Sequence, residues 1–201
     1  MIKRIFDVVF CSLVFLFGFP IFLLCILAVK CSSPGPVFYA HHRIGKNGKP
    51  FGCLKFRTMY SDAALKLQTL LASDPRLMEE WKTYYKLKFD PRITPIGKWL
   101  RKTSLDELPQ FINVFKGDMS LVGPRPLTQD EVTNYLREKA PKILSLRPGL
   151  TTLWSVKGRN LFTLEERIEL EEEYIHRRSF WLDLKLICQT AYQMIFPKGV
   201  Y

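Results

Sequence analysis

Two carboxylates, Asp106 and Glu107, are adjacent in the segment whose residue types are best suited to catalysis. They follow the cations Lys98, Arg101 and Lys102, whose positive charge favours the ionised form of a carboxylate. An ionised carboxylate can attack phosphorus to form a phosphoryl-aspartate, or it can hold Mg²⁺ against a diphosphate. The pair therefore indicates phosphoryl chemistry, and the residues alone rank neither the two acids nor the two roles.

Several cations lie in segments that the sequence makes rigid. Arg125 stands between two prolines in a Gly-Pro-Arg-Pro sequence, and proline fixes φ, so this loop loses little entropy on binding a ligand. A guanidinium matches a phosphate through two parallel hydrogen bonds. Lys55 and Arg57 alternate along a predicted strand and so share a face, while Arg147 and Arg159 lie in Gly- and Pro-containing loops. Each alone is explained as a solvated charge, but together with the acids they indicate a diphosphate site.

The composition limits the other kinds of site. The 201 residues include five cysteines without a Cys-X-X-Cys pair and three histidines without a His-X-X-X-His pair, which argues against a disulfide framework, a zinc ribbon and a His-based metal site. Neither the Walker A sequence nor Gly-X-Gly-X-X-Gly occurs, so phosphate binding falls to side chains and helix N-termini. A net charge of +11 predicts an anionic partner: nucleic acid, phospholipid headgroups or a phosphorylated substrate.

The segment from Val8 to Val29 carries no charged residue. As a helix it would be about 33 Å long, enough to cross a hydrocarbon core of about 30 Å. Gly18 and Pro20 interrupt the run, and proline removes a backbone donor, so we expect a kink or break there. Basic residues flank both ends, which favours the cytoplasmic side for both. A re-entrant helix and a kinked span both stay open, whereas a cleaved signal peptide fits poorly because no small-X-small site follows.

The rest of the chain predicts an α+β domain that is mainly helical. Asn47-Gly48 between Val37–Ile44 and Phe51–Met59 predicts a β-hairpin. Further helices are predicted after Asp62, after Asp74, over Ile96–Lys102, after capping boxes at Thr128 and Thr163, and over Phe180–Phe196. The last of these either packs its apolar face on the core or lies in the membrane interface.

Three segments near the candidate residues have more specific predictions. Ser104–Lys116 has helical spacing, with Gly117 as its end; because Pro109 would delete a hydrogen bond in that helix, a start at Pro109 is the alternative. Leu150–Val156 is predicted as a short strand. The acidic run Glu165–Glu173 is interpreted as a solvated helix face.

Six motifs follow one another along the chain: LysPheArgThrMet (55–59), SerLeuAspGluLeuProGln (104–110), GlyProArgPro (123–126), ArgProGlyLeuThr (147–151), GlyArgAsn (158–160) and LeuAspLeuLys (182–185). With these motifs the chain resembles the monotopic phosphoglycosyl transferases of the bacterial sugar transferase superfamily over essentially its whole length. The resemblance implies a re-entrant membrane helix at residues 1–32, broken near Pro20. It also implies a cytoplasmic membrane-surface catalytic domain at residues 33–201, with a β-hairpin and interfacial amphipathic helices.

The resemblance also implies an activity. Asp106 would be the nucleophile and Glu107 its partner, with Mg²⁺ on the diphosphate and the same two acids as metal ligands. A UDP-hexose would pass its sugar-1-phosphate to Asp106 and release UMP, and undecaprenyl phosphate would then accept the phosphosugar. The branch of the family that the chain resembles most, in exopolysaccharide and O-antigen assembly, implies galactose or glucose as the hexose. The residues implied to bind substrate are Lys55, Arg57, Arg101, Arg125, Arg147, Arg159 and Asp183.

The expected partners are therefore a UDP-hexose, undecaprenyl phosphate and membrane lipid, not nucleic acid, at the cytoplasmic face of a bacterial inner membrane; a homodimer is allowed. The chain departs from the family at Thr152, where Gly is usual, and at Ser155-Val156-Lys157, beside Arg159, so the sugar stays open. Two other functions compete: a non-enzymatic basic membrane-surface module and a membrane-bound aspartyl-phosphate hydrolase. The first gives no reason for the acid pair or for an arginine held between prolines.

Overall fold

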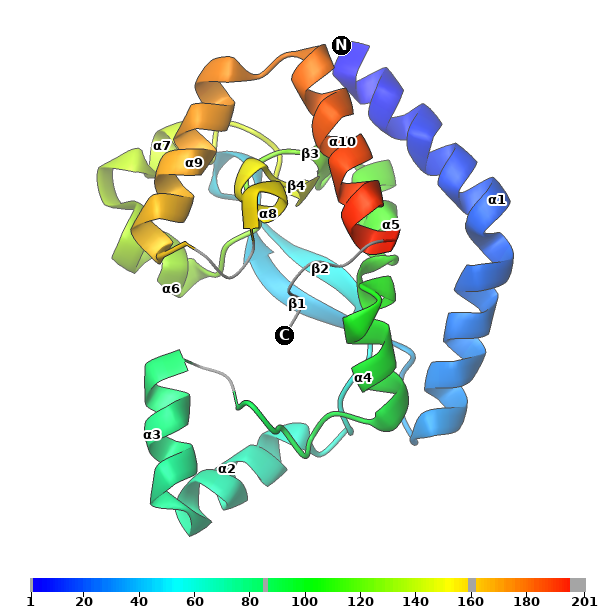
Figure 1. The fold of residues 1–201 in the computed structure, drawn as a ribbon, viewed down its shortest axis with the longest axis vertical. Helices are drawn as coiled ribbons and strands as arrows, with labels where there is room; N and C mark the ends of the chain where they lie inside the picture. Colours follow the sequence, from blue (N-terminus) through cyan, green and yellow to red (C-terminus); the bar gives the residue numbers. More distant parts are fainter. Residues whose placement is uncertain (1, 85–86, 159–161, 196–201) are drawn as a thin grey trace. The chain divides into compact units, whose positions relative to one another are not determined.

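The apolar N-terminal segment forms α1 (Ile2–Ser32), whose helical assignment runs through Pro20 without interruption (Figure 1). By length and composition α1 could cross a membrane. Most of its large apolar side chains are exposed, Phe17 to 75% and Leu16 to 69%, as expected for a helix that meets lipid. The helix therefore continues where the proline predicted a break, and a re-entrant path through a membrane stays a prediction.

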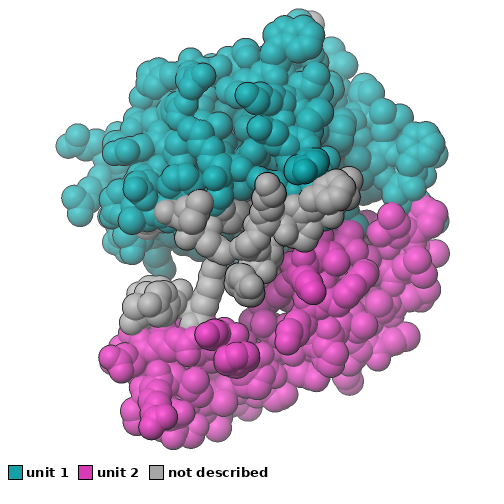
Figure 2. Space-filling model, in the orientation of Figure 1, with its two compact units in different colours: residues 1–19, 40–55, 108–201 teal, residues 20–39, 56–107 magenta. Residues whose placement is uncertain are grey.

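The computed structural model describes residues 2–84, 87–158 and 162–195. The chain divides into two compact units, coloured separately in Figure 2. Unit 1 comprises residues 1–19, 40–55 and 108–201, and unit 2 comprises residues 20–39 and 56–107. The carboxylate pair belongs to unit 2 and the Gly-Pro-Arg-Pro loop to unit 1.

The predicted hairpin is confirmed. Strands β1 (Phe38–Ile44) and β2 (Pro50–Phe56) pair in a two-stranded sheet, joined through the 3-10 turn η1 (Lys46–Gly48). Asn47 has φ 57° and Gly48 has φ 76°, and these are residue types that adopt the left-handed region at little cost.

Unit 2 contains α2 (Ala63–Ser73), α3 (Pro75–Tyr84), α4 (Pro95–Lys102) and the 3-10 turn η2 (Leu105–Glu107). The start of α4 is fixed by Thr94, whose side chain accepts a hydrogen bond from the Gly97 N–H, with Pro95 in the first turn. Gly97 lies against the Thr58 backbone, where an added Cβ would come within 2.0 Å of the carbonyl oxygen. A glycine is therefore needed for α4 to pack on the segment that follows β2.

Unit 1 contains a second small sheet, in which β3 (Ser120–Val122) and β4 (Gly149–Thr151) pair in parallel, Ser120 opposite Gly149. Its helical elements are α5 (Gln110–Lys116), α6 (Gln129–Glu131), the π-helical turn η3 (Val132–Leu136), η4 (Arg137–Lys139), α7 (Ala140–Ile143), α8 (Leu153–Gly158), α9 (Leu164–Arg177) and α10 (Phe180–Ile195). Both predicted capping boxes are present.

One element prediction was decided between its alternatives and another was wrong. The helix within Ser104–Lys116 begins at Gln110, with Pro109 as its N-cap, so the alternative start at the proline is the observed one. The strand predicted over Leu150–Val156 ends at Thr151, where the Thr152 and Ser155 side chains bond to each other's backbone N–H groups and open α8. In the first segment a proline sets the start of the helix, and in the second a pair of side-chain hydrogen bonds ends the strand. Apolar spacing alone indicates neither boundary.

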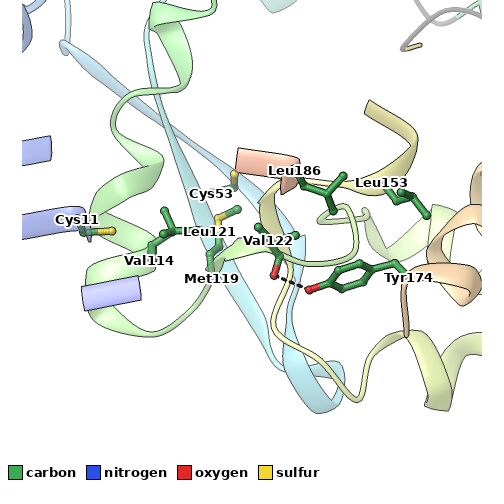
Figure 3. Close-up of a cluster of buried hydrophobic side chains, with 9 residues drawn as sticks. All are labelled: Cys11, Cys53, Val114, Met119, Leu121, Val122, Leu153, Tyr174 and Leu186. Atoms are coloured by element: carbon green, nitrogen blue, oxygen red, sulfur yellow. Dashed lines mark hydrogen bonds between the residues drawn. The ribbon is translucent and has the colours of Figure 1, made fainter. Parts of the chain in front are cut away.

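The core of unit 1 is a cluster from α1, β2, α5, β3, α8, α9 and α10 (Figure 3). Its buried members are Cys11, Cys53, Val114, Met119, Leu121, Val122, Leu153, Tyr174 and Leu186. The Tyr174 hydroxyl donates to the Val122 carbonyl at 3.3 Å and to Asp183 Oδ1 at 2.7 Å, which satisfies the polar end of a buried aromatic side chain.

The charged residues at the start of α1 bond to the remainder of unit 1. Asp7 accepts hydrogen bonds from Ser120 Oγ and the Leu121 N–H, Lys3 pairs with Asp183, and Arg4 donates to carbonyls at the end of α5. The first turns of the apolar helix are thus held to the domain by polar contacts, and most of its exposed apolar side chains lie beyond them.

Candidate active site

Asp106 lies on the tight 3-10 turn η2 and is only 8% exposed. The turn is set up at Ser104, which has φ 57°, and the Glu107 N–H donates to the Ser104 carbonyl. Unusual backbone of this kind persists where the surrounding structure holds it, and it is common at functional sites. The acids therefore stand on a turn with a defined shape and not within a regular helix.

Arg101, in the last turn of α4, is a cation of unit 2 that interacts with this turn. Its Nε donates to Thr58 Oγ1 at 2.9 Å, which ties it to the LysPheArgThrMet segment. The surrounding protein partly desolvates Arg101 and lowers its pKa, while the carboxylates of Asp106 and Asp90 act in the opposite direction. Arg101 and Asp106, both predicted site residues, thus interact electrostatically within one unit.

A pair that the sequence interpretation missed supports this region. Arg92 binds Asp90 through two parallel bonds, of 2.8 Å from Nε and 2.6 Å from Nη2, and both side chains are buried. Burial would raise the pKa of Asp90, but the hydrogen bonds and charge of Arg92 bring it below its ordinary value. The Asp-Pro-Arg sequence was interpreted only as a loop; its spacing is the signal that could have predicted the pair.

Arg57, predicted to share a strand face with Lys55, is buried just beyond β2. Its guanidinium donates to the Ser33 and Pro34 carbonyls at 2.6 and 2.8 Å, immediately after α1. Lys55 remains part-exposed. Arg57 therefore stabilises the chain where it leaves the apolar helix, a structural role that the alternation did not indicate.

Arg125 is exposed at the tip of a loop that packs tightly on its neighbour. The Gly149 N–H donates to the Pro124 carbonyl at 2.7 Å, and a Cβ at Gly123 would come within 2.4 Å of the Arg147 carbonyl. Two predicted motifs, GlyProArgPro and ArgProGlyLeuThr, are therefore brought back to back, and only glycine fits at the contact. The Arg147 side chain donates to the Gly117 carbonyl at 2.7 Å.

Beside Arg125 lies a pocket of about 50 Å³ whose lining includes Trp154, Arg167 and Glu171. Glu171 is 5% exposed, and its Oε1 accepts the Arg125 N–H at 3.0 Å. Burial raises the pKa of Glu171 to about 8, although the hydrogen bond from the Arg125 N–H and the charge of Arg125 oppose the shift. The prediction that Glu165–Glu173 is wholly a solvated face was thus wrong at this position.

The remaining predicted site residues are placed as follows. Asp183 is buried and bound to Tyr174 and Lys3, so it orders the packing of α9, α10 and α1. Arg159 lies outside the described residues. The sequence interpretation also missed Trp154 and Arg167, whose guanidinium carbon lies 4.8 Å from the indole centre; the signal was an aromatic residue and an arginine in neighbouring helices.

The described residues contain no group of three or more His, Cys, Asp or Glu side chains suited to hold a metal ion. Mg²⁺ is usually held by one or two carboxylates together with substrate phosphates, so an all-protein cluster is not required. The carboxylates of Asp106 and Glu107, which follow one another on the turn, are the donor type that such a site needs.

The chain belongs to the bacterial sugar transferase family, whose model matches residues 1–197. The exopolysaccharide production protein ExoY of Sinorhizobium fredii is 44% identical over 199 residues, which is 99% of this chain and 88% of that protein.

Two further relatives are longer proteins. The undecaprenyl-phosphate galactose phosphotransferase of Salmonella typhimurium is 41% identical over 200 residues, covering 100% of this chain and 42% of that protein. The UDP-glucose:undecaprenyl-phosphate glucose-1-phosphate transferase of Escherichia coli is 37% identical over 209 residues, again 100% of this chain and 42% of that protein. The chain thus spans less than half the length of these two relatives.

Proposed function

We propose that this protein transfers hexose-1-phosphate from a UDP-hexose, UDP-galactose or UDP-glucose, to undecaprenyl phosphate and releases UMP. The observation that carries the proposal is the largely buried carboxylate of Asp106 on a defined turn, with Arg101 close enough to act on it electrostatically. The Salmonella and Escherichia relatives are named for this kind of transfer.

The chemistry proceeds in two displacements. An Asp106 oxygen attacks the phosphorus that bears the sugar, and the bond from that phosphorus to the UMP oxygen breaks, which leaves an aspartyl phosphosugar. A phosphate oxygen of undecaprenyl phosphate then attacks the same phosphorus and releases the Asp106 carboxylate. Asp106 needs no general base, because a carboxylate is already ionised at neutral pH.

Positive charge must offset the repulsion between a carboxylate and a diphosphate. Arg101 supplies charge beside Asp106, and Arg125, exposed on its rigid loop, binds a substrate phosphate through its two-pronged guanidinium. Mg²⁺, when bound by Asp106 and Glu107, would add further charge at the diphosphate. Glu107, the next residue on the turn, is the proposed partner of the nucleophile.

The acceptor is a lipid, so the protein must work at a membrane surface. The exposed apolar side chains of α1 supply the anchor, and α10 buries Leu186 while exposing Trp181 to 76% and Tyr192 to 56%. The final helix thus has both a core face and an aromatic face suited to headgroup depth. We place the domain at the cytoplasmic face of the bacterial inner membrane, with α1 re-entrant.

The proposal is tested by UMP release from the purified full chain in detergent with Mg²⁺, across a panel of UDP-sugars, with and without undecaprenyl phosphate. Sustained release that requires the lipid and prefers one UDP-hexose supports the transferase. Sustained release without lipid would instead indicate a hydrolase. No release from any UDP-sugar would favour a membrane-binding module.

A further inference from the structure

Glu171 is a buried acid that the proposed reaction does not use. Its Oε1 accepts the backbone N–H of Arg125, and its Oε2 is buried without a hydrogen-bond partner among the described residues. An unpaired buried oxygen costs free energy unless a ligand or water satisfies it. Because Glu171 lines the pocket beside Arg125, the missing partner can be a ligand held there.

The charges around the pocket favour an anion. Arg125 and Arg167 both line it, with guanidinium carbons 5.5 and 4.8 Å from the Trp154 ring centre. Arg43 of β1 also acts on this region, but its Nη1 is paired with Glu131 Oε2 at 2.9 Å. Arg125 and Arg167 thus bring positive charge to the pocket lining, and Glu131 in the same lining is bound by Arg43.

The size of the pocket limits the ligand. About 50 Å³ corresponds to a few water molecules, so the pocket admits a single tetrahedral oxyanion and not a whole nucleotide or sugar. Apart from Glu131, which Arg43 binds, the rest of its lining is apolar or aromatic and includes Leu127 and Ile168, which disfavours an unpaired ionised carboxylate there.

We propose that this pocket binds one phosphate group of a substrate, with Arg125 and Arg167 as its cationic ligands and with the protonated Glu171 carboxyl donating an Oε2–H hydrogen bond to a phosphate oxygen. The proposal rests on the proposed function for the identity of its ligand. The pocket adds Arg167 and Glu171 to the proposed substrate-binding residues. The Glu171 carboxyl can donate the hydrogen bond to phosphate only when it is protonated.

This arrangement makes binding depend on pH. Burial raises the pKa of Glu171 to about 8, so at pH 7 the carboxyl is neutral and can donate, whereas above pH 8 it is an anion that repels phosphate. The charged groups facing it are Arg125 on its loop, Arg167 on α9 and the Arg43–Glu131 pair. The terminal phosphate of UDP is already ionised in this range, since its second pKa lies near 6.

The test is calorimetric titration of the purified full chain in detergent with UDP, and separately with undecaprenyl phosphate, at pH 7 and pH 9. The wild type should bind the ligand of this pocket roughly tenfold more weakly at pH 9. Glu171→Gln should bind as the wild type does at pH 7 and keep that affinity at pH 9, because the amide still donates. Glu169→Gln, an exposed acid on the same helix, is the matched control and should keep the wild-type pH dependence.

Arg167→Gln gives an independent arm and should weaken binding of the same ligand about tenfold. A pH effect on UDP alone assigns the pocket to the nucleotide sugar, and one on undecaprenyl phosphate alone assigns it to the acceptor. Unchanged pH dependence in Glu171→Gln, unchanged affinity in Arg167→Gln, or no binding of either ligand by the wild type would overturn the proposal. If the wild type binds the ligand with the expected pH dependence but releases no UMP from any UDP-sugar, only the proposed function is contradicted.

Discussion

At the scale of the residue, a substitution at Arg125 tests whether its guanidinium binds a phosphate or only supplies positive charge. Arg125→Lys keeps the charge but loses the two parallel donors, so UMP release should fall roughly ten- to hundredfold in kcat/KM. Arg76→Lys, at an exposed position in unit 2, is the matched control and should be unchanged. Full turnover in Arg125→Lys would show that Arg125 acts only through its positive charge.

Glu171 also makes a prediction for stability. Burial raises its folded pKa from the ordinary 4.5 to about 8, so between these values the folded state binds more protons than the unfolded state. The free energy of unfolding should therefore fall as pH rises through this window, by up to about 1.4 kcal/mol per pH unit. Glu171→Gln removes this contribution. Thermal unfolding at pH 6 and pH 8 measures it, and parallel shifts in the variant and wild type would contradict it.

Buried polar residues were the least predictable at this scale. Glu171 and Glu172 are adjacent residues of the same type in the acidic run on α9, yet Glu172 binds Lys139 and Lys142 at the surface. What buries Glu171 is a tertiary contact with the Arg125 N–H, 46 positions away in the sequence. The partners of Arg57 were unpredictable for the same reason, since they follow α1.

At the scale of the element, α4 positions the turn that carries Asp106. An alanine Cβ at Gly97 would lie 2.0 Å from the Thr58 carbonyl oxygen, so α4 must move in Gly97→Ala. We expect a loss of about 1–3 kcal/mol in stability together with loss of UMP release.

Gly18→Ala is the control, because its Cβ meets only Val14 at 3.9 Å. Chemical denaturation in detergent compares the two variants. A Gly97→Ala protein as stable and active as the Gly18→Ala protein would show that the packing of α4 on the Thr58 segment is not required.

Elements with local signals were predictable from the sequence. The Asn-Gly turn of the hairpin, both capping boxes, α4 and α10 appear within a residue or two of their predicted positions, since each is specified by its own turn or cap residues. The 3-10 turn at Asp106 was not, because apolar spacing alone cannot register that Ser104 adopts a left-handed backbone.

At the scale of the whole molecule, the proposed re-entrant path of α1 fixes the side of the membrane on which each of its ends lies. We predict that both ends of the helix are cytoplasmic, because basic residues flank both. Labelling of single cysteines, one in a tag before Lys3 and one near Lys46, in a cysteine-free background reports sidedness. Periplasmic labelling of the N-terminus would contradict re-entry. Pro20→Ala should shift the population toward spanning, because it restores a backbone donor.

The covalent role of Asp106 is the central claim, and trapping the intermediate tests it most directly. The full chain is incubated with UDP-hexose labelled in the sugar and with Mg²⁺, without undecaprenyl phosphate, then digested and analysed by mass spectrometry. We predict a phosphosugar on the peptide that contains Asp106, one equivalent of UMP, and neither in Asp106→Asn, which should still bind UDP. A direct transfer between the two substrates would give no adduct and no UMP until the lipid is added, and that result would contradict the account.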